Sequence, residues 1–283
     1  MSCRTPPIFF LVIASALTAC SPTPRATSTP SPVTAKPASS PVPLSWHPSR
    51  QPSLLRYTLQ DSSVLSISSD STTKQIPFIT TAFLQLMISS IGDSFTFSGR
   101  SDSVLVHSEL QKTTPIDTML RIFGTLSRQG AITQVQSPAN SLCKIGIEPA
   151  MARITSLLVK IPETISINSR WTDSSTTIIC HGKTALRQTV IRSYHVIADT
   201  IWGEHSALRV EDSTLLTISS VEGDSTNHIF TTGNGLTATV LLLDANTGAL
   251  LESSSHGSVL LTISTTRGTF PFRQFSFTRI RQR

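Results

Sequence analysis

Charged residues are scarce in this 283-residue chain. Lys and Arg number 23, Asp and Glu number 17, and the first acid is Asp61. With so few charged residues the surface cannot consist mainly of charged groups, so Ser and Thr must cover much of it. Tyr is also rare, with two residues, whereas Ser, Thr, Val and Ile are abundant. This composition favours β-strands over helices.

Motifs of the common enzyme classes are absent. The chain has no Gly-x-Ser-x-Gly elbow, no His-Glu-x-x-His pair, no phosphate loop and no Cys-x-x-Cys. Its seven His residues are scattered, at His47, His107, His181, His195, His205, His228 and His256. We therefore expect a protein that is not an enzyme and has no catalytic residue, cofactor or metal site.

The N-terminal apolar run is too short to cross a bilayer as a helix. It extends from Ile8 to Leu17, about ten residues, whereas a spanning helix needs about 20. Arg4 precedes the run, and Thr18 and Ala19 follow it. A charged start, a short apolar core and small residues at the cut predict a secretory signal peptide over residues 1–19.

The cut itself resembles the lipobox of bacterial lipoproteins, because Leu17-Thr18-Ala19 is followed directly by Cys20. The resemblance implies that Cys20 becomes the first residue and carries palmitate-type acyl chains. It also implies a membrane partner and attachment in the bacterial cell envelope, facing the periplasm or the surface. Ser21 follows the Cys and favours the outer membrane. An ordinary signal peptide, with Cys20 incidental, is the alternative.

Residues 20–50 form the predicted tether. Positions 21–50 hold eight Pro and eleven Ser or Thr and no acid. Such a segment cannot bury enough apolar surface to offset the entropy of ordering, so it stays disordered. In an extended polyproline conformation its reach is roughly 90 Å. The remaining residues, 51–283, suit one β-rich domain or two small subdomains.

Two cysteines, Cys143 and Cys180, remain after the signal peptide and the lipid site. A pair in an oxidising compartment predicts a disulfide. The bond would close a loop of about 38 residues and contribute roughly 3–4 kcal/mol. A zinc site is disfavoured because only His181, which is adjacent to Cys180, lies near either cysteine.

Alternating apolar residues predict strands at both ends of the domain, which form possible halves at residues 51–112 and 174–283. Two helices are predicted between them. Thr114-Pro115 is typical of a helix start, and apolar residues then recur at helical spacing over 115–129 until Gly130. A second apolar stripe covers 149–160 and ends before Pro162.

Three further spots were weighed for binding. Asp244-x-Asn246-x-Gly248 with Glu252 is superficially similar to a calcium loop, but its ligand spacing fails and a β-turn is favoured. Gly233-Asn234-Gly235 could suit a phosphate, but no helix start follows, so a turn before the strand at Leu236 is favoured. Gly257 is interpreted as a further turn. A third group is close in sequence and either lines a site or lies on alternating faces of strands: Tyr194, His195, Trp202, Glu204 and His205.

A family of uncharacterised bacterial lipoproteins is similar in its spacing. The shared elements are Ile161-Pro162 before Trp171, then Tyr194, then Gly233-x-Gly235 and an Asp244-x-x-Thr247-Gly248 turn. The family carries Gly three residues before the Trp, where this chain has Asn168. No established activity follows from this resemblance.

The predicted fold is β-rich α+β: a large curved antiparallel sheet with two central helices packed on it. This arrangement resembles the lipoprotein-carrier fold, an open half-barrel that holds acyl chains, at fold level only. The leading hypothesis is a non-enzymatic envelope lipoprotein that binds an apolar ligand. The alternatives are a structural or assembly lipoprotein that binds another envelope protein or polymer, and an envelope hydrolase.

The C-terminal arginines leave two interpretations open. They either meet anionic lipid or polysaccharide or solvate a basic edge strand that blocks aggregation. Nucleic acid is not an expected partner. The residues concerned are Arg267, Arg273, Arg279, Arg281 and Arg283.

Overall fold

The structure is a computed structural model that describes residues 53–69, 72–92, 94–108, 111–116, 121–136, 153–162, 164–181, 184–220 and 229–283. Within these ranges the only regular elements besides strands are a helical turn at residues 153–155 and a bridge at Ile165. The predicted signal peptide, lipid site Cys20 and tether lie outside the described residues, as does Cys143. The disulfide therefore stays a prediction.

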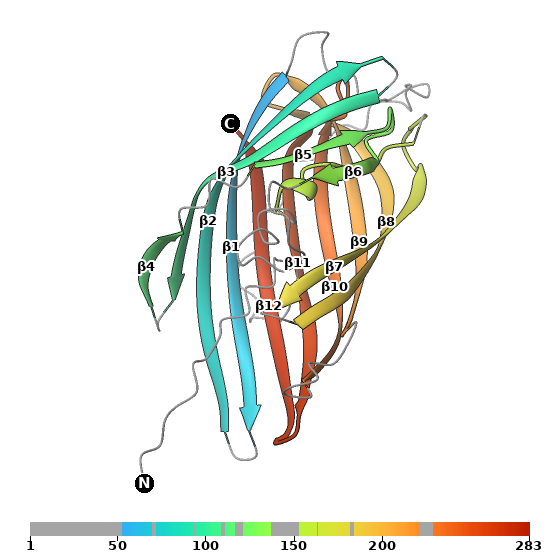
Figure 1. The fold of residues 1–283 in the computed structure, drawn as a ribbon. Coiled ribbons are helices and arrows are strands. Elements are labelled where there is room, and N and C mark those ends of the chain that lie inside the picture. Colours follow the sequence, from blue (N-terminus) through green and yellow to red (C-terminus); the bar gives the residue numbers. More distant parts are fainter. Residues whose placement is uncertain are drawn as a thin grey trace, which may run out of the picture.

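Twelve strands form a single antiparallel sheet (Figure 1). They are β1 (Ser53–Ser69), β2 (Thr72–Ile91), β3 (Ser94–Ser108), β4 (Gln111–Ile116), β5 (Arg121–Leu126), β6 (Ile132–Gln136), β7 (Arg170–His181), β8 (Thr184–Trp202), β9 (His205–Ser220), β10 (Phe230–Asp244), β11 (Leu250–Thr265) and β12 (Gly268–Gln282). The predicted large antiparallel sheet is confirmed.

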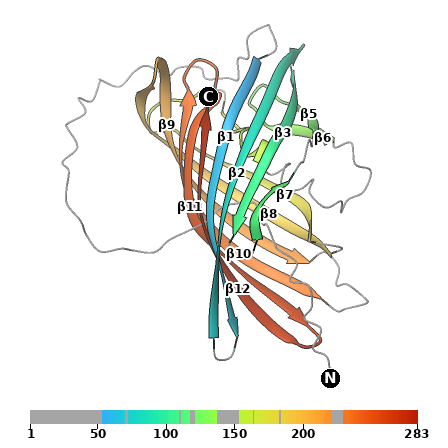
Figure 2. The same ribbon diagram turned by 90° about the vertical axis from the view of Figure 1, so that its left-hand side faces the viewer.

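The order of the strands is β6-β5-β3-β2-β1-β12-β11-β10-β9-β8-β7, and β4 pairs with β3 beside this path. The sheet is open, because β6 and β7 lie at its two ends. Its middle is the pairing of β1 with β12, the first and last strands. The sheet is strongly twisted, so the strands of its two wings cross in direction in Figure 2.

Alternation of side chains explains why these segments are strands. In β2 the apolar residues at every second position, from Ala82 to Ile88, are fully buried. The residues between them are half-buried or exposed. A period of two is the signature of a strand with one covered face. We call the covered side of the sheet the core face and the other side the outer face.

The segment 153–162 fills the core face at one end of the sheet. Its apolar side chains are nearly or wholly buried against residues of both wings, such as Leu84 and Val210. The Ile161 amide donates a hydrogen bond of 2.7 Å to the Gln129 carbonyl, which fixes the segment to the turn between β5 and β6. Each buried Leu or Ile contributes roughly 1.5–3 kcal/mol.

The predicted helix over 115–129 is wrong, because the region contains strands β4 and β5 and the turn after them. Ile122 and Leu126 are both fully buried, and a spacing of four residues fits a strand as well as a helix. Gly124 lies between them on the same face, where a Cβ atom would collide with the Phe97 ring. The missing side chain hid the period of two.

The predicted helix over 149–160 is also wrong beyond a single turn. Among its described residues only 153–155 are helical. The Leu157 amide donates to the Ile154 carbonyl at 3.1 Å, and the chain then becomes extended. The apolar stripe did predict burial correctly, since Ile154 and Leu157 are fully buried.

The turn predictions had different outcomes. Asp244–Gly248 is a turn, as predicted: the Asp244 Oδ1 atom accepts hydrogen bonds from the amides of Asn246 (2.8 Å) and Thr247 (2.9 Å). Gly248 has a φ of 73°, which glycine adopts without strain. Gly257 is not a turn, because it lies inside β11 and pairs with Thr237 and Ser276. The predicted turn at Gly233-Asn234-Gly235 is wrong for the same reason, because these residues lie inside β10 and pair with β11.

The C-terminal strand is not an edge strand. β12 pairs with β1 on one side and β11 on the other, which overturns the interpretation of its arginines as an edge that blocks aggregation. Arg279 and Arg281 instead approach Glu252 on β11, at 2.5 Å and 3.8 Å.

Candidate functional site

A band of polar residues crosses the middle of the core face. These side chains are buried although they are polar or charged, and they come from β1, β2, β9, β10 and β12. We call them the core polar band: Asp61, Ser63, Thr80, Asp212, Thr237, Ser276 and Thr278.

Hydrogen bonds between neighbouring strands satisfy one end of this band. Thr278 donates from Oγ1 to Asp61 Oδ1 at 2.7 Å, and Ser63 donates from Oγ to Asp61 Oδ2 at 2.8 Å. Arg153, from the segment that fills the core, is buried with the charge of Asp61 near it. Burial lowers the pKa of Arg153, and the Asp61 carboxylate opposes that shift. These groups keep a charge pair inside the protein.

The other end of the band is centred on Asp212. Thr214 donates to Asp212 Oδ2 at 2.9 Å, whereas Asp212 Oδ1 is buried without a hydrogen-bond partner. Burial raises the pKa of Asp212 to about 6, against the opposing effects of Thr214 and of the Arg192 charge. The same surroundings raise the pKa of Tyr194 to about 12, mainly through burial.

The outer face carries exposed apolar side chains at the level where the core face carries buried polar ones. Large apolar side chains there are at least 40% exposed, and they come from β2 and β8 to β12. We call them the outer apolar band: Ile79, Ile191, Leu215, Leu236, Leu260 and Phe277.

The two bands lie back to back along the strands. In β12 the half-exposed Phe277 stands between Ser276 and Thr278, which are 1% and 5% exposed. In β10 Leu236 is 62% exposed and its neighbour Thr237 only 5%. Successive side chains of a strand point to opposite faces. The middle of the sheet is therefore polar on its covered side and apolar on its outer side.

A groove lies on the outer face beside this apolar band, with a volume of about 640 Å³. Its floor is a row of small residues that are direct partners across β7 to β10: Thr172, Ser193, Ser213 and Ala238. His256 on β11 continues the row. Because strands are about 4.8 Å apart, the four-residue floor spans roughly 14 Å.

Two unlike walls border the floor. On one side lies a row of direct partners, Arg170, His195 and Glu211. On the other side, two residues further along each strand, lies the apolar row of Ile191, Leu215 and Leu236. The groove therefore has a charged wall, a floor of small side chains and an apolar wall.

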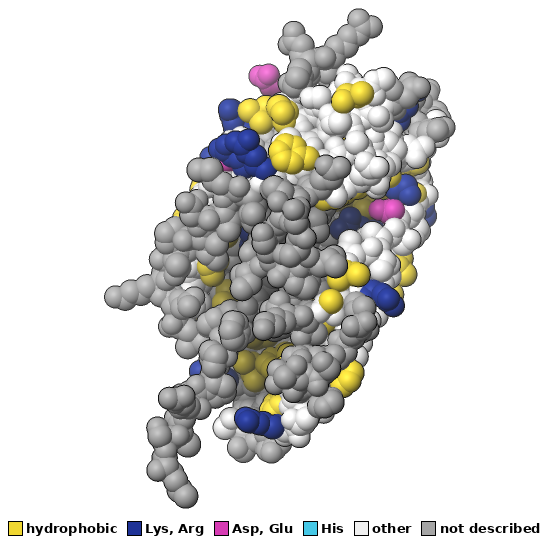
Figure 3. All heavy atoms as spheres, viewed as in Figure 1, with side chains coloured by type: hydrophobic (Ala, Val, Ile, Leu, Met, Phe, Trp, Pro, Cys, Tyr) yellow, Lys and Arg dark blue, Asp and Glu magenta, His cyan; other side chains and the backbone are white. Residues whose placement is uncertain are grey.

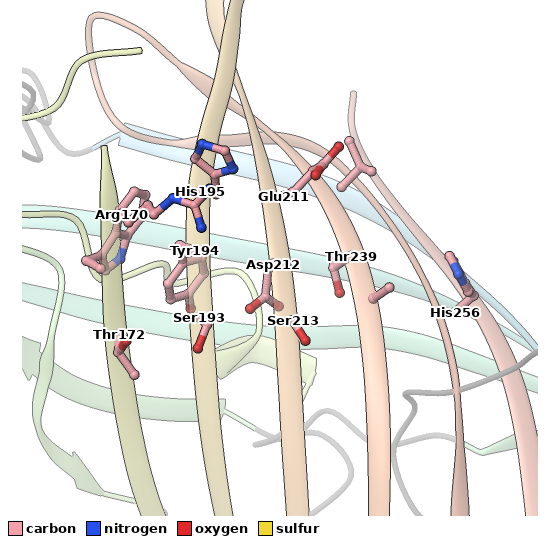
Figure 4. Close-up of a pocket in the computed structure, with 13 residues that line it drawn as sticks. Arg170, Thr172, Ser193, Tyr194, His195, Glu211, Asp212, Ser213, Thr239 and His256 are labelled. Carbon is pink, nitrogen blue, oxygen red and sulfur yellow. The ribbon is translucent and has the colours of Figure 1, made fainter. Parts of the chain in front are cut away.

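Figure 4 shows how the groove residues point. The Arg170 side chain extends from β7 toward His195 on β8, and Glu211 points away from its sequence neighbour Asp212. His256 lies apart from the other titratable residues, across β10. The charged wall is thus a row of two basic side chains, Arg170 and His195, followed by the carboxylate of Glu211.

The five residues weighed as a site from the sequence fall into three places. Tyr194 and His195 both border the groove, but the Tyr194 side chain is buried on the core face, whereas His195 is half-buried on the outer face. Trp202 donates from Nε1 to Glu252 at 3.1 Å, and His205 Nδ1 lies 3.0 Å from Asp244 Oδ2. Glu204 is exposed in the turn between β8 and β9. They do not form one site.

Tyr194 and Trp171, both part of the family resemblance, stack with ring centroids 4.8 Å apart. Trp171 also donates from Nε1 to the Lys160 carbonyl at 2.9 Å, which holds the end of the core-filling segment against β7. Asn168, at the position where that family has Gly, has a φ of 70°. Asn is among the few residues that adopt this conformation readily. These residues have a structural role.

Sequence reasoning missed Arg170, Glu211 and His256 as groove residues. Each stands in a separate strand with no local motif. Only the pairing register brings Arg170 and Glu211 to the charged wall and His256 to the row of the floor. No cluster of three or more His, Cys, Asp or Glu side chains that could hold a metal occurs among the described residues. No helix in that part of the chain is long and apolar enough to cross a membrane.

A scan against protein-family models and a search of curated proteins found no match. A solved structure that aligns with the chain comes from Vibrio parahaemolyticus and is described as an outer membrane lipoprotein-sorting protein domain. The alignment covers 77% of this chain and 83% of that one, at 8% identity and a TM-score of 0.13. A TM-score this low does not establish a shared fold.

Proposed function

We propose that this protein is a lipid-anchored, non-enzymatic module of the bacterial cell envelope that binds a ligand with an apolar chain. The ligand lies in the outer-face groove, with its chain along the apolar wall and an anionic group toward Arg170 and His195. The signal peptide, the lipobox ending at Cys20 and the tether support the location in the envelope.

The observation that carries this proposal is the contrast between the two walls of the groove. An amphiphile with an anionic head binds where apolar surface for its chain lies beside a cationic group for its head. The floor of Ser193, Ser213 and Ala238 gives that separation and leaves room above the sheet. Pockets of several hundred Å³ are the usual size for such ligands.

The core face is a poorer place for an apolar chain. At one end the segment 153–162 already fills it with buried Leu and Ile side chains. In the middle, an apolar chain would have to lie against Asp61, Asp212 and their hydroxyl partners, and burying such groups without compensation is costly. Binding therefore differs from the concave-side binding that the carrier resemblance implies.

Native mass spectrometry tests this proposal. The protein is purified from the envelope of its host and compared with a double variant, Ser213→Gln with Ala238→Gln, whose side chains fill the floor. The matched control is Thr217→Gln with Thr232→Gln, on the same two strands outside the groove. We expect a mass excess, removable by organic extraction, in the wild type and the control and its loss in the groove variant.

A bare mass for the wild-type protein, after subtraction of the anchor on Cys20, would overturn the proposal. An excess of equal size in the groove variant would place the ligand elsewhere and would also overturn it. A thermal unfolding scan shows whether each variant is folded, because exposed strand substitutions change stability little.

A second candidate function is assembly with another envelope protein through β7. This strand ends the sheet and is paired only with β8. Its described side chains from Thr172 to Thr177 are Ser or Thr apart from Asp173, without the Pro or Lys that commonly protects an edge. Added strands bind such edges through main-chain hydrogen bonds. Reproducible crosslinking of β7 to one envelope protein would support this candidate, and its absence would oppose it.

A further inference from the structure

The outer apolar band extends well beyond the groove. Ile191, Leu215 and Leu236 border the groove, and Leu260, Phe277 and Ile79 continue the band over β11, β12 and β2. From β8 to β2 the band crosses six strand spacings, which is roughly 29 Å. Partly exposed Phe275 and Val64, which are direct partners, bridge its middle.

The exposure of this band is unusual for a sheet face in contact only with water. Single exposed apolar residues are normal, but a contiguous apolar patch marks a contact surface. Leu236, at 62%, and Ile79, at 53%, are the most exposed members. A shift of the register by one residue would turn these residues inward, but it would turn every other side chain of the same strand as well. The apolar side chains that pack against residues 153–162 would then face outward, and the core would be lost.

The charge around the band selects its partner. On the side toward the turn between β11 and β12, the polar outer-face positions of the described strands include Ser, Thr, Asn, Gln and Arg and no acid. Arg187 and Arg273 stand there, and the Arg273 guanidinium lies 5.7 Å from the centre of the Phe275 ring. The chain as a whole has a net charge of +6, and in the space-filling view Lys and Arg surface exceeds Asp and Glu surface (Figure 3).

We propose that the outer apolar band docks on the interface of an anionic bilayer, the membrane to which the tether is predicted to attach the chain. Apolar side chains enter the boundary of the headgroups, and Arg187 and Arg273 approach the anionic headgroups. A second copy of the chain fits less well, because two chains that each carry a net charge of +6 repel one another, whereas an anionic bilayer attracts them.

The predicted tether makes this contact accessible. Cys20 lies 33 residues before Ser53, where the first strand begins. An extended segment of that length reaches roughly 100 Å, and a relaxed one about 30 Å. A tethered domain meets its membrane at a high effective concentration, so weak docking suffices. The docking does not depend on the groove holding a ligand.

Sedimentation with lipid vesicles tests the proposal without the lipid anchor. The chain from Ser21 to Arg283 keeps the tether and every described residue. It is mixed with vesicles of phosphatidylcholine alone or with added phosphatidylglycerol. We expect binding to the anionic vesicles, weakened by salt, and little binding to the neutral ones.

Two variants locate the contact. Leu260→Thr with Phe277→Thr removes exposed apolar surface outside the groove, and we expect the partition coefficient to fall by roughly tenfold or more. Leu54→Thr with Met87→Thr removes side chains of similar exposure at the opposite end of β1 and β2 and should bind as the wild type does. Arg187→Gln with Arg273→Gln should reduce the preference for anionic vesicles.

Several results would overturn the docking proposal. Wild-type protein that does not bind anionic vesicles would do so, as would equal losses in the Leu260 and Leu54 variants. A Leu260 variant that changes only the oligomeric state would identify a second copy as the occupant instead. Because these substitutions lie outside the groove floor, loss of docking with the ligand mass retained, or the reverse, separates this proposal from the proposed function.

Discussion

The two faces of the sheet follow opposite rules in its middle. On the core face, Asp61 and Asp212 are buried among hydroxyl groups, whereas on the outer face Leu215 and Leu236 are exposed. At the end filled by residues 153–162, the ordinary rule holds and apolar residues are inside. The comparison teaches that the fold is anchored by apolar packing at one end. The polar middle contributes less to stability, because the cost of burying its charges opposes the gain from the hydrogen bonds that they accept.

The largest effect of a substitution on folding stability is expected at the end of the sheet that residues 153–162 fill. Leu157 is fully buried against both wings of the sheet, so Leu157→Ala removes packing and leaves a cavity. We expect a loss of about 2–5 kcal/mol in the free energy of unfolding, measured by urea denaturation. The exposed Leu54→Ala is the control and should change stability by less than about 0.5 kcal/mol. Similar losses in both would show that the core is not where the structure places it.

The charge at the centre of the core polar band gives the next largest effect. Because burial raises the pKa of Asp212 to about 6, above its value of about 4 in the unfolded chain, the folded state holds its proton more tightly. Stability from this group is fully present below pH 4 and is lost as the pH rises to 6. The loss is roughly 3 kcal/mol.

Asp212→Asn removes that titration. The variant should therefore unfold at higher urea than the wild type at neutral pH and at about the same urea near pH 4. Stability curves measured across this pH range by circular dichroism check the expectation. Parallel curves for the two proteins would mean that Asp212 is solvated or ion-paired in solution.

A hydroxyl in the band should matter less. Thr278 donates a hydrogen bond to Asp61, so Thr278→Val keeps the shape of the side chain and removes one donor from a buried carboxylate. We expect a loss of about 1–3 kcal/mol in the free energy of unfolding, measured by denaturant titration. Ser62→Val, the neighbouring outer-face position on β1, serves as the comparison. A stabilised Thr278→Val protein would contradict the role of this hydrogen bond.

The smallest effect on folding is expected on the outer face. Leu236→Thr removes the most exposed member of the outer apolar band, and the free energy of unfolding should stay within about 0.5 kcal/mol of the wild-type value. Thermal unfolding without lipid measures this. A loss comparable to that of Leu157→Ala would mean that Leu236 is covered in the folded protein, and the contrast between the two faces would fail.

The alternation of apolar and polar residues predicts many strands of the sheet, but it does not predict which of the two alternating sets of side chains faces the core. The pattern in β12, with Phe275 and Phe277 alternating with polar residues, correctly predicts a strand. It also invites the conclusion that the phenylalanines face the core, whereas Phe277 is half-exposed. Period comes from the local sequence, but the choice of buried face depends on partners in other strands. Strand β2 could not be recognised in this way, because residues 82–88 are apolar at every position except Gln85, so the period of two is visible only in their burial.

The candidate site was harder to predict than the fold. His195 was singled out from its sequence neighbours, but its true partners are Arg170 and Glu211, which lie 25 and 16 positions away in the sequence. The pairing register between strands determines which of these side chains are neighbours, and no short sequence motif predicts that register. The Asp244 turn, by contrast, was predictable because its hydrogen bonds are local.

The pairing of the first strand with the last has a kinetic consequence. Asp61 and Thr278 form a hydrogen bond although they are 217 positions apart in the sequence. Each wing is a series of neighbouring hairpins that can form early, but the seam between β1 and β12 requires closure of almost the whole domain. Synthesis must therefore reach the final strand before the two wings can join. Until that moment both strands of the seam are open edges, and aggregation competes with folding there.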